Sequence, residues 1–226
     1  MHLLRPILGF FVILPICLTA SAQEFRSDST GFAIKVTPDA PEILLKLIAD
    51  GHSPNGWTKT VVEKLDSQAT RPDESELKIT FQDDQHLALK RQFSTKGQVL
   101  SGKEAWQTDG SEIDGHVRFY LLLSSRDFPE ATLVMPDKTL RLSENQVAEG
   151  AETIYNSDRV DTFHIGGLNG KQFVFTYDQP GKVEVLAQSP DASGDRKTEI
   201  RIYWPPGPPA KLTSGTFDWT LEVAKE

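Results

Sequence analysis

The sequence predicts an all-β fold, namely a large two-sheet antiparallel β-sandwich with at most one short helix. Beyond residue 57, apolar and polar residues alternate in short runs, which is the period of a strand with one face in a core and one in water. Turn sequences such as Asn169-Gly170 and Pro180-Gly181 separate these runs. Roughly a dozen such runs are more than one small sheet holds, so we expect two packed layers.

The first candidate element, residues 43–48, leaves helix and strand open. Asp39 is placed to cap a helix, and Gly51 is placed to end it. Apolar residues such as Ile43 and Leu45 nevertheless alternate, as they would in a strand. The length of the segment suits both structures, so the pattern alone does not decide between them.

The middle of the chain predicts strands and a hairpin. Residues 76–81 alternate with period two, and residues 86–93 do so less strictly. Residues 116–123 begin by alternating and become continuously apolar, as a strand covered on both faces does. Residues 134–142 predict a hairpin whose turn is Pro136-Asp137-Lys138.

The remaining strands are predicted by four further alternating runs: residues 171–177, 182–186, 198–204 and 216–223. In the last run, Trp219 alternates with Phe217 and Leu221, which predicts a place in the core. The proline-rich residues 204–209 lie between the last two runs and predict a stiff connecting loop. The alternative for this loop is a polyproline ligand for an aromatic groove.

The first 22 residues predict a cleavable export signal. Arg5 gives a positive start, residues 7–18 are almost all apolar, and small residues lead to a cleavage site between Ala22 and Gln23. The apolar run is shorter than the roughly 20 residues of a membrane-spanning helix, so we expect no stable membrane span after cleavage. We therefore expect an exported protein, periplasmic or extracellular, with a single β-sandwich domain over residues 23–226.

Charge and cysteine content exclude several classes of function. The chain has a net charge of −8 and no cluster of lysine and arginine, which argues against a nucleic-acid partner. Its one cysteine, Cys17, lies within the predicted signal. Disulfide bonds and thiol catalysis are therefore excluded for the mature chain.

No catalytic or metal-binding motif is found in the mature chain. Its histidines lack the spacing of a zinc site, and no G-x-S-x-G nucleophile motif is present. Residues 109–115 and 191–195 carry carboxylates at a spacing close to that of a hard-cation loop, but they fit polar turns better. We predict no catalytic residue, no metal site and no cofactor.

The order of the strands resembles a known fold. The runs that carry the resemblance are residues 79–83, 87–91, 163–165, 171–175, 183–186, 200–203 and 217–221. Together they resemble the β-supersandwich of galactose-mutarotase-like domains in secreted bacterial carbohydrate-active proteins. The resemblance covers about residues 30–224 and implies a carbohydrate context. The family's catalytic glutamate and histidine match no position of this sequence.

Two tryptophans are candidates for carbohydrate binding. Trp57 and Trp106 both lie at loop edges, where an indole ring can stack on the apolar face of a sugar. With the export signal and the absent acid–base motif, they predict an exported, non-catalytic β-sandwich protein. Its expected partner is a glycan or another exported protein.

Two alternatives to this function remain open. The first is a carbohydrate-active enzyme on the same scaffold, either mutarotase- or epimerase-like or a lyase. It would use His86, His116 or His164 with a neighbouring carboxylate as a general acid–base pair. The second is a structural protein of the cell envelope.

Overall fold

The computed structural model describes residues 24–27, 31–37, 39–53, 56–58, 61–64, 74–81, 85–110, 113–144 and 147–226. The predicted export signal and its cleavage site at Ala22 and Gln23 lie outside these residues. Within them the chain is almost entirely strand, with one 3₁₀ turn at Leu142–Glu144. No helix in the described part is long and apolar enough to cross a membrane. The predicted all-β class is confirmed.

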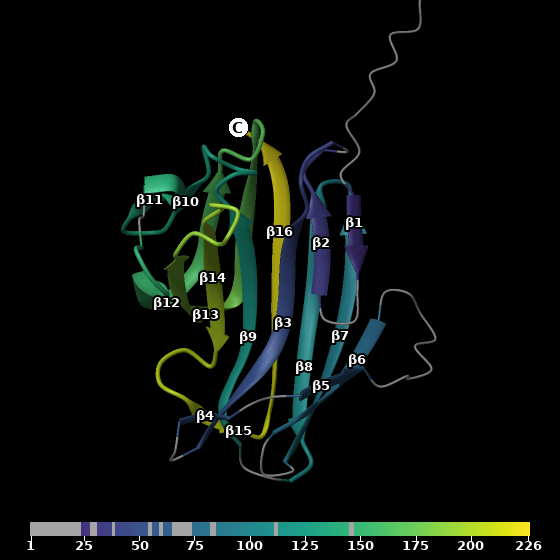
Figure 1. The fold of residues 1–226 in the computed structure, drawn as a ribbon. Helices are drawn as coiled ribbons and strands as arrows, with labels where there is room; N and C mark the ends of the chain where they lie inside the picture. Colours follow the sequence, from purple (N-terminus) through teal and green to yellow (C-terminus); the bar gives the residue numbers. More distant parts are fainter. Residues whose placement is uncertain are drawn as a thin grey trace, which may run out of the picture.

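The described residues form sixteen antiparallel strands (Figure 1). Their bounds are β1 Glu24–Ser27, β2 Gly31–Lys35, β3 Ile43–Ser53, β4 Gly56–Thr58, β5 Val61–Lys64, β6 Glu74–Thr80, β7 His86–Lys96, β8 Val99–Thr108, β9 Ile113–Ser124, β10 Thr132–Val134, β11 Thr139–Arg141, β12 Ala151–Gly166, β13 Lys171–Gln188, β14 Lys197–Trp204, β15 Ala210–Leu212 and β16 Ser214–Lys225.

The open choice at residues 43–48 is settled in favour of a strand. Strand β3 pairs with β2 on one side and with β9 on the other. Ile43 and Leu45 are fully buried, whereas Leu44 and Lys46, which alternate with them, are half-buried. The period-two alternation was therefore the correct signal, because two neighbouring strands satisfy the backbone that a helix would have satisfied internally.

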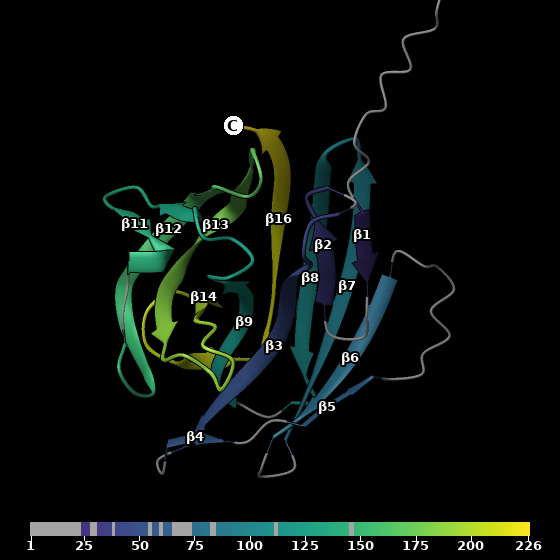
Figure 2. The same ribbon diagram turned by 45° about the horizontal axis from the view of Figure 1, so that its top comes forward.

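Strand β13 joins the two layers of the sandwich. Its first half, Lys171–Tyr177, pairs with β16, and its second half, Lys182–Ala187, pairs with β14. The change of partner falls at Pro180-Gly181, where Pro180 is exposed and Gly181 is buried. The prediction of a turn between separate strands at residues 171–177 and 182–186 is wrong here, because the strand continues through Pro180-Gly181 and only changes its partner. One layer therefore runs β1-β2-β3-β9-β14 and the second half of β13; the other runs from the first half of β13 through β16-β8-β7-β6-β5. We call these the first and second layers. Figures 1 and 2 both show β1 and β2 in front of β7 and β8.

Aromatic rings fill the space between the layers. Phe119 of β9 meets Phe217 and Trp219 of β16 edge-on, with ring centroids 5.6 and 5.1 Å apart. Trp204 of β14 stacks on Phe217 at 3.9 Å. All four rings are at most 2% exposed, so the predicted core position of Trp219 is confirmed. Edge-on and stacked pairs add to the stabilisation that burial of their apolar area provides.

Two smaller predictions are also confirmed. Strands β10 and β11 form the expected hairpin, closed by a 2.8 Å hydrogen bond from the Met135 amide to the Lys138 carbonyl. The proline-rich residues 205–209 form the loop after β14, and short β15 follows this loop and pairs with β9.

Candidate functional site

A cleft of about 480 Å³ lies on the outer face of the first layer. Side chains alternate between the two faces of a strand, so burying Val117, Ile202 and Val183 in the core turns their neighbours outward. Strands β9, β13 and β14 supply most of the lining, and the loop after β14 supplies one wall. The lining residues define the basic cleft: His116, Arg118, Lys182, Glu184, Leu186, Arg201, Tyr203, Gly207 and Pro209.

The register of the three strands brings the polar side chains together. Tyr203 of β14 lies directly opposite Arg118 on one side and Lys182 on the other. One step along β14 on the same face, Arg201 lies opposite Glu184 of β13. Directly opposite residues in an antiparallel pair are close enough for their side chains to interact. The register therefore places Tyr203 at the centre of the basic cleft.

A carboxylate, a guanidinium and a phenol form one hydrogen-bonded group in the basic cleft. The Tyr203 hydroxyl donates to Glu184 Oε2 at 3.0 Å, and an Arg201 nitrogen lies 3.7 Å from the same oxygen. Arg201 also donates two hydrogen bonds to Glu199, of 2.8 and 3.1 Å. Burial, followed by the negative charge of Glu184, raises the pKa of Tyr203 above its usual value. Tyr203 is therefore a neutral donor at physiological pH.

Two further cations lie against the Tyr203 ring. The Arg118 guanidinium carbon and the Lys182 Nζ are each 5.9 Å from the ring centroid. Arg118 also lies 5.5 Å from the centroid of Tyr120. These are cation–π distances. With Arg201, the described lining of the basic cleft carries three cations and one carboxylate, in a chain whose net charge is −8.

His116 closes one end of the basic cleft. Its ring meets Tyr203 edge-on at 5.2 Å, and its Nε2 lies 3.3 Å from the carbonyl oxygen of Gly207 in the proline-rich loop. This contact requires a proton on Nε2. Burial lowers the pKa of His116, and the positive charges of Lys182 and Arg118 lower it further, while the loop carbonyls oppose the shift. His116 is thus a neutral imidazole at pH 7.

The tryptophans singled out in the sequence do not line the basic cleft. Trp106 lies in β8 of the second layer, 5.9 Å from Phe217, and its ring covers Gly215, where a Cβ atom would come within 2.2 Å of it. Trp57 lies in β4, paired with His52 of β3, and its side chain is outside the described part of the chain. Carbohydrate binding by Trp57 and Trp106 stays a prediction.

The strand histidines proposed for an enzyme are not gathered in one place. His86 lies at the start of β7, where its Nδ1 is 3.1 Å from the Thr80 hydroxyl. His164 lies in β12, opposite Val174 and Val134. Among the histidines whose side chains are described, His116 is the one in the basic cleft.

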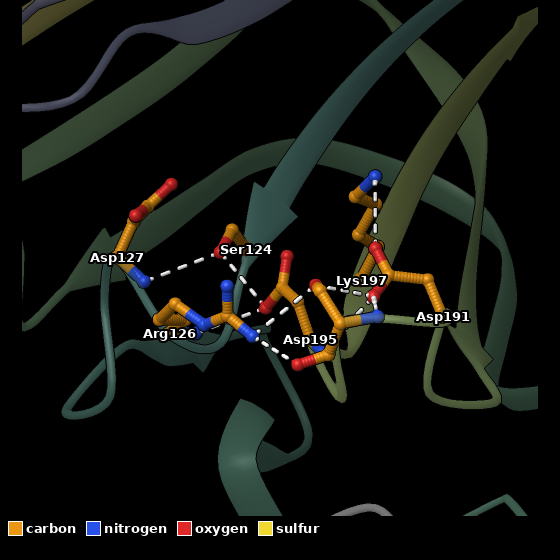
Figure 3. A network of polar contacts seen from close by, with 7 residues as sticks. Ser124, Arg126, Asp127, Asp191, Asp195 and Lys197 are labelled. Atoms are coloured by element: carbon orange, nitrogen blue, oxygen red, sulfur yellow. Dashed lines mark hydrogen bonds and ion pairs between the residues drawn. The ribbon is translucent and has the colours of Figure 1, made fainter.

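The carboxylates at residues 191–195 hold a loop together (Figure 3). Asp191 Oδ1 accepts hydrogen bonds from the amides of Ser193 and Asp195 and from the Ser193 hydroxyl. Asp195 accepts from the Ser124 hydroxyl and the Arg126 amide. The interpretation as a polar turn is confirmed here. Residues 111–112 of the other carboxylate cluster lie outside the described residues, and no described group of three or more His, Cys, Asp or Glu is placed to hold a metal ion.

Sequence reasoning missed most of the residues of the basic cleft. Arg118, Lys182, Glu184, Arg201 and Tyr203 occupy the non-core positions of three predicted strands, where charged residues are expected in any case. Their proximity depends on β14 lying between β9 and β13, a long-range pairing. The available signal was local: three predicted strands each carry two charged or aromatic residues on one face.

Comparisons with known proteins find the fold in solved structures. No family model matches the chain, and no curated protein matches it. A proposed aldose 1-epimerase from Escherichia coli K12 is 12% identical over 76% of this chain and 69% of its own, with a TM-score of 0.49. The α-N-acetylgalactosaminidase NagBb from Bifidobacterium bifidum, in complex with GalNAc, is 9% identical over 90% of this chain and 36% of its own, with a TM-score of 0.50. The Slr1438 protein from Synechocystis sp. PCC 6803 is 9% identical over 91% of this chain and 96% of its own, with a TM-score of 0.48.

These similarities concern the fold. The match to the galactosaminidase spans nearly all of this chain and about a third of that enzyme. At a TM-score of 0.50, this match shows that the chain shares the fold of that part of the galactosaminidase, in agreement with the β-supersandwich that the order of its strands resembles. A shared fold does not fix the chemistry, which has to be argued from this chain's own cleft.

Proposed function

We propose that this chain is an exported, non-catalytic protein that binds carbohydrate in the basic cleft. The observation that carries the proposal is the set of fixed polar groups around one aromatic ring, Tyr203, in a cleft of about 480 Å³. That volume lies within the roughly 300–1,000 Å³ of typical small-molecule sites. Export rests on the predicted signal in residues 1–22.

The chemistry of the basic cleft suits sugar hydroxyls. A hydroxyl both donates and accepts, so it is satisfied best by donors and acceptors placed side by side. Glu184 supplies acceptors, while Arg201 and Lys182 supply donors. The Tyr203–Glu184 and Arg201–Glu199 hydrogen bonds hold these groups in place before a ligand arrives. Such pre-organisation lowers the entropy cost of binding.

The arrangement favours binding over catalysis. His116 turns Nε2 toward the loop carbonyl of Gly207, so this nitrogen is engaged with the protein itself. Glu184 in turn accepts a hydrogen bond from Tyr203 and lies near Arg201. Groups that satisfy one another serve as a fixed recognition surface more readily than as a base and an acid aimed at one carbon.

A direct test is calorimetric titration of residues 23–226 with a panel of mono- and oligosaccharides. We expect saturable binding, weakened about tenfold or more by Glu184→Gln and by Tyr203→Phe, because each removes a hydrogen bond involving a charged group. Lys103→Ala, an exposed lysine of the second layer, is the matched control and should bind normally. No binding by any sugar would refute the proposal, and loss of binding in the control would move the site elsewhere.

A second candidate, an enzyme on the same scaffold, is favoured by one observation. Neutral His116 meets Tyr203 at 5.2 Å, and Tyr203 in turn donates to Glu184, so a base and an acid share the basic cleft. Mutarotation is checked by polarimetry of fresh α-glucose and α-galactose, where an unaltered rate ends that version. The lyase version is checked by ultraviolet absorbance of an unsaturated product from a uronate polymer.

A further inference from the structure

We propose that the basic cleft selects glycans that carry an anionic group, a carboxylate or a sulfate ester, and that Arg118 and Lys182 recognise this group beside the Tyr203 ring. This inference rests on the proposed function, since it names the class of sugar that the same cleft takes. Its first support is the distribution of charged side chains in the basic cleft.

The balance of charge in the basic cleft is uneven. Glu184 and Glu199 both lie around Arg201, at 3.7 Å and at 2.8 to 3.1 Å. These two carboxylates are therefore directed at a single cation. The Lys182 ammonium makes no ion pair with any described residue, and its close contact is with the face of Tyr203. Within the described lining, positive charge is thus in excess on the Tyr203 side of the cleft.

The enclosure of the basic cleft strengthens the attraction of its excess positive charge for an anion. The basic cleft is walled by the loop at Gly207 and Pro209, so water screens its charges less than those of an open surface. The positive field also reaches His116, whose pKa is lowered in part by Lys182 and Arg118. The net charge of the whole chain is −8, so the protein as a whole does not attract anions. Attraction of an anion is a local property of the basic cleft.

The positions of the charged side chains suit a sugar that has an acidic group at one end and uncharged hydroxyls at the other. A guanidinium presents a planar fork of donors that fits the two oxygens of a carboxylate or sulfate, and a lysine ammonium adds a point charge. Arg118 and Lys182 come from the two strands that flank β14, and each lies 5.9 Å from the centroid of the Tyr203 ring. The acidic group of a sugar placed over Tyr203 would lie between them. The uncharged hydroxyls would then face Glu184 and Arg201.

The test compares matched ligands on the intact mature chain. Calorimetry with galacturonate oligosaccharides is set beside the same oligosaccharides after reduction of their carboxyls to alcohols, and beside a sulfated oligosaccharide and its desulfated form. We expect the charged member of at least one pair to bind about tenfold tighter or more, an advantage that shrinks as salt is raised. The pair that shows it identifies carboxylate or sulfate as the recognised group.

Substitutions assign the effect to residues. Lys182→Ala should abolish most of the preference, because it weakens binding of the charged member far more than binding of the uncharged member. Arg118→Gln should do the same, and Arg118→Lys, which keeps the charge and loses the fork, should retain part of the preference. Lys103→Ala in the second layer is the matched loss of one positive charge and should have no effect.

The possible failures are distinct. Equal binding of charged and uncharged members overturns this inference and leaves the proposed function standing. A preference that Lys182→Ala and Arg118→Gln do not change also overturns it. No binding by any member refutes the proposed function itself. A folding defect in Arg118→Gln is recognised by its loss of binding to the uncharged sugar, and Lys182→Ala then decides the matter.

Discussion

Each layer of the sandwich contains a carboxylate in contact with a guanidinium and an aromatic donor, and the two settings differ. In the second layer, Arg91 donates to Glu104 at 3.2 Å, and the Trp219 indole donates to the other oxygen of Glu104 at 3.0 Å. On the first layer, Glu184 takes the place of Glu104, with Arg201 and Tyr203 around it. Each group contains a carboxylate, a guanidinium and an aromatic donor.

The settings differ in exposure. The side chains of Arg91 and Glu104 are 1% and 0% exposed, whereas those of Arg201 and Glu184 are 25% and 21% exposed. Burial raises the pKa of Glu104, although Arg91 and Trp219 both act to lower it. The sealed group therefore serves the fold, since no ligand reaches it, while the open group can exchange water for a ligand. Residue types do not distinguish a structural group from a binding group; the side of the sheet on which they lie does.

The largest expected effect comes from breaking the carboxylate of each group in turn. Glu104→Gln leaves the Arg91 charge buried without its counter-charge, which should lower the free energy of unfolding by about 3–5 kcal/mol. Glu184→Gln, the same chemical change on the open face, should lower it by about 1 kcal/mol or less. Urea unfolding of both variants measures the difference. Equal losses would mean that exposure does not separate the two groups.

A methyl group added beside the sealed group should have the next largest effect. Gly102 of β8 lies opposite Trp219, and a Cβ atom there would come within 2.2 Å of the indole ring. Gly102→Ala should therefore lower the free energy of unfolding by about 1–3 kcal/mol, because the ring has to move in a packed core. Ser101→Ala, on the opposite face of the same strand, is the control, with an expected change within about 0.5 kcal/mol. A neutral Gly102→Ala would show that the indole is not held in place.

Much of the sandwich was predictable because strand faces are a local property. Alternation correctly placed Phe217 and Trp219 in the core. The same alternation puts Arg91 on the apolar face of β7 with Leu87 and Leu89, so a buried charge was present in the pattern and needed only Glu104 to explain it. Local periodicity alone left residues 43–48 open between helix and strand, because pairing with β2 and β9 is what makes this segment a strand.

The basic cleft was not predictable for a different reason. Tyr203 and Glu184 are neighbours because β13 leaves β16 and joins β14 halfway along its length. Nothing in a single strand's pattern encodes which strand it pairs with, and a strand shifted by one residue would turn Tyr203 to the other face. The site is therefore a property of register and pairing, while the core is a property of pattern.

A smaller effect is expected for a substitution in the loop that forms one wall of the basic cleft. Gly207 has a φ of 89°, a conformation that other residues rarely adopt. Gly207→Ala should cost about 1 kcal/mol of stability and also weaken sugar binding, because the wall beside His116 shifts. Gly150 has a φ of 74° with open space around it and lies outside the cleft lining. Gly150→Ala should cost a similar amount in thermal unfolding and leave binding unchanged; a loss of binding in both would refute the role of the loop.

The smallest expected effect is one of pH on the open face. His116 is faced by Arg118 from its own strand, by Lys182 and Tyr203 from β13 and β14, and by loop carbonyls including that of Gly207.

Because the pKa of His116 is lowered in the folded state, the neutral form is favoured there. Its contribution to stability is complete above the unfolded value of about 6.5 and is lost as pH falls through the lower folded value. The unfolding free energy of the wild type minus that of His116→Gln should therefore decrease between pH 7 and pH 5 in urea titrations. His164→Gln, outside the cleft, controls for loss of a histidine. A flat or rising difference would mean that burial, together with the positive charges of Lys182 and Arg118, does not lower the pKa of His116.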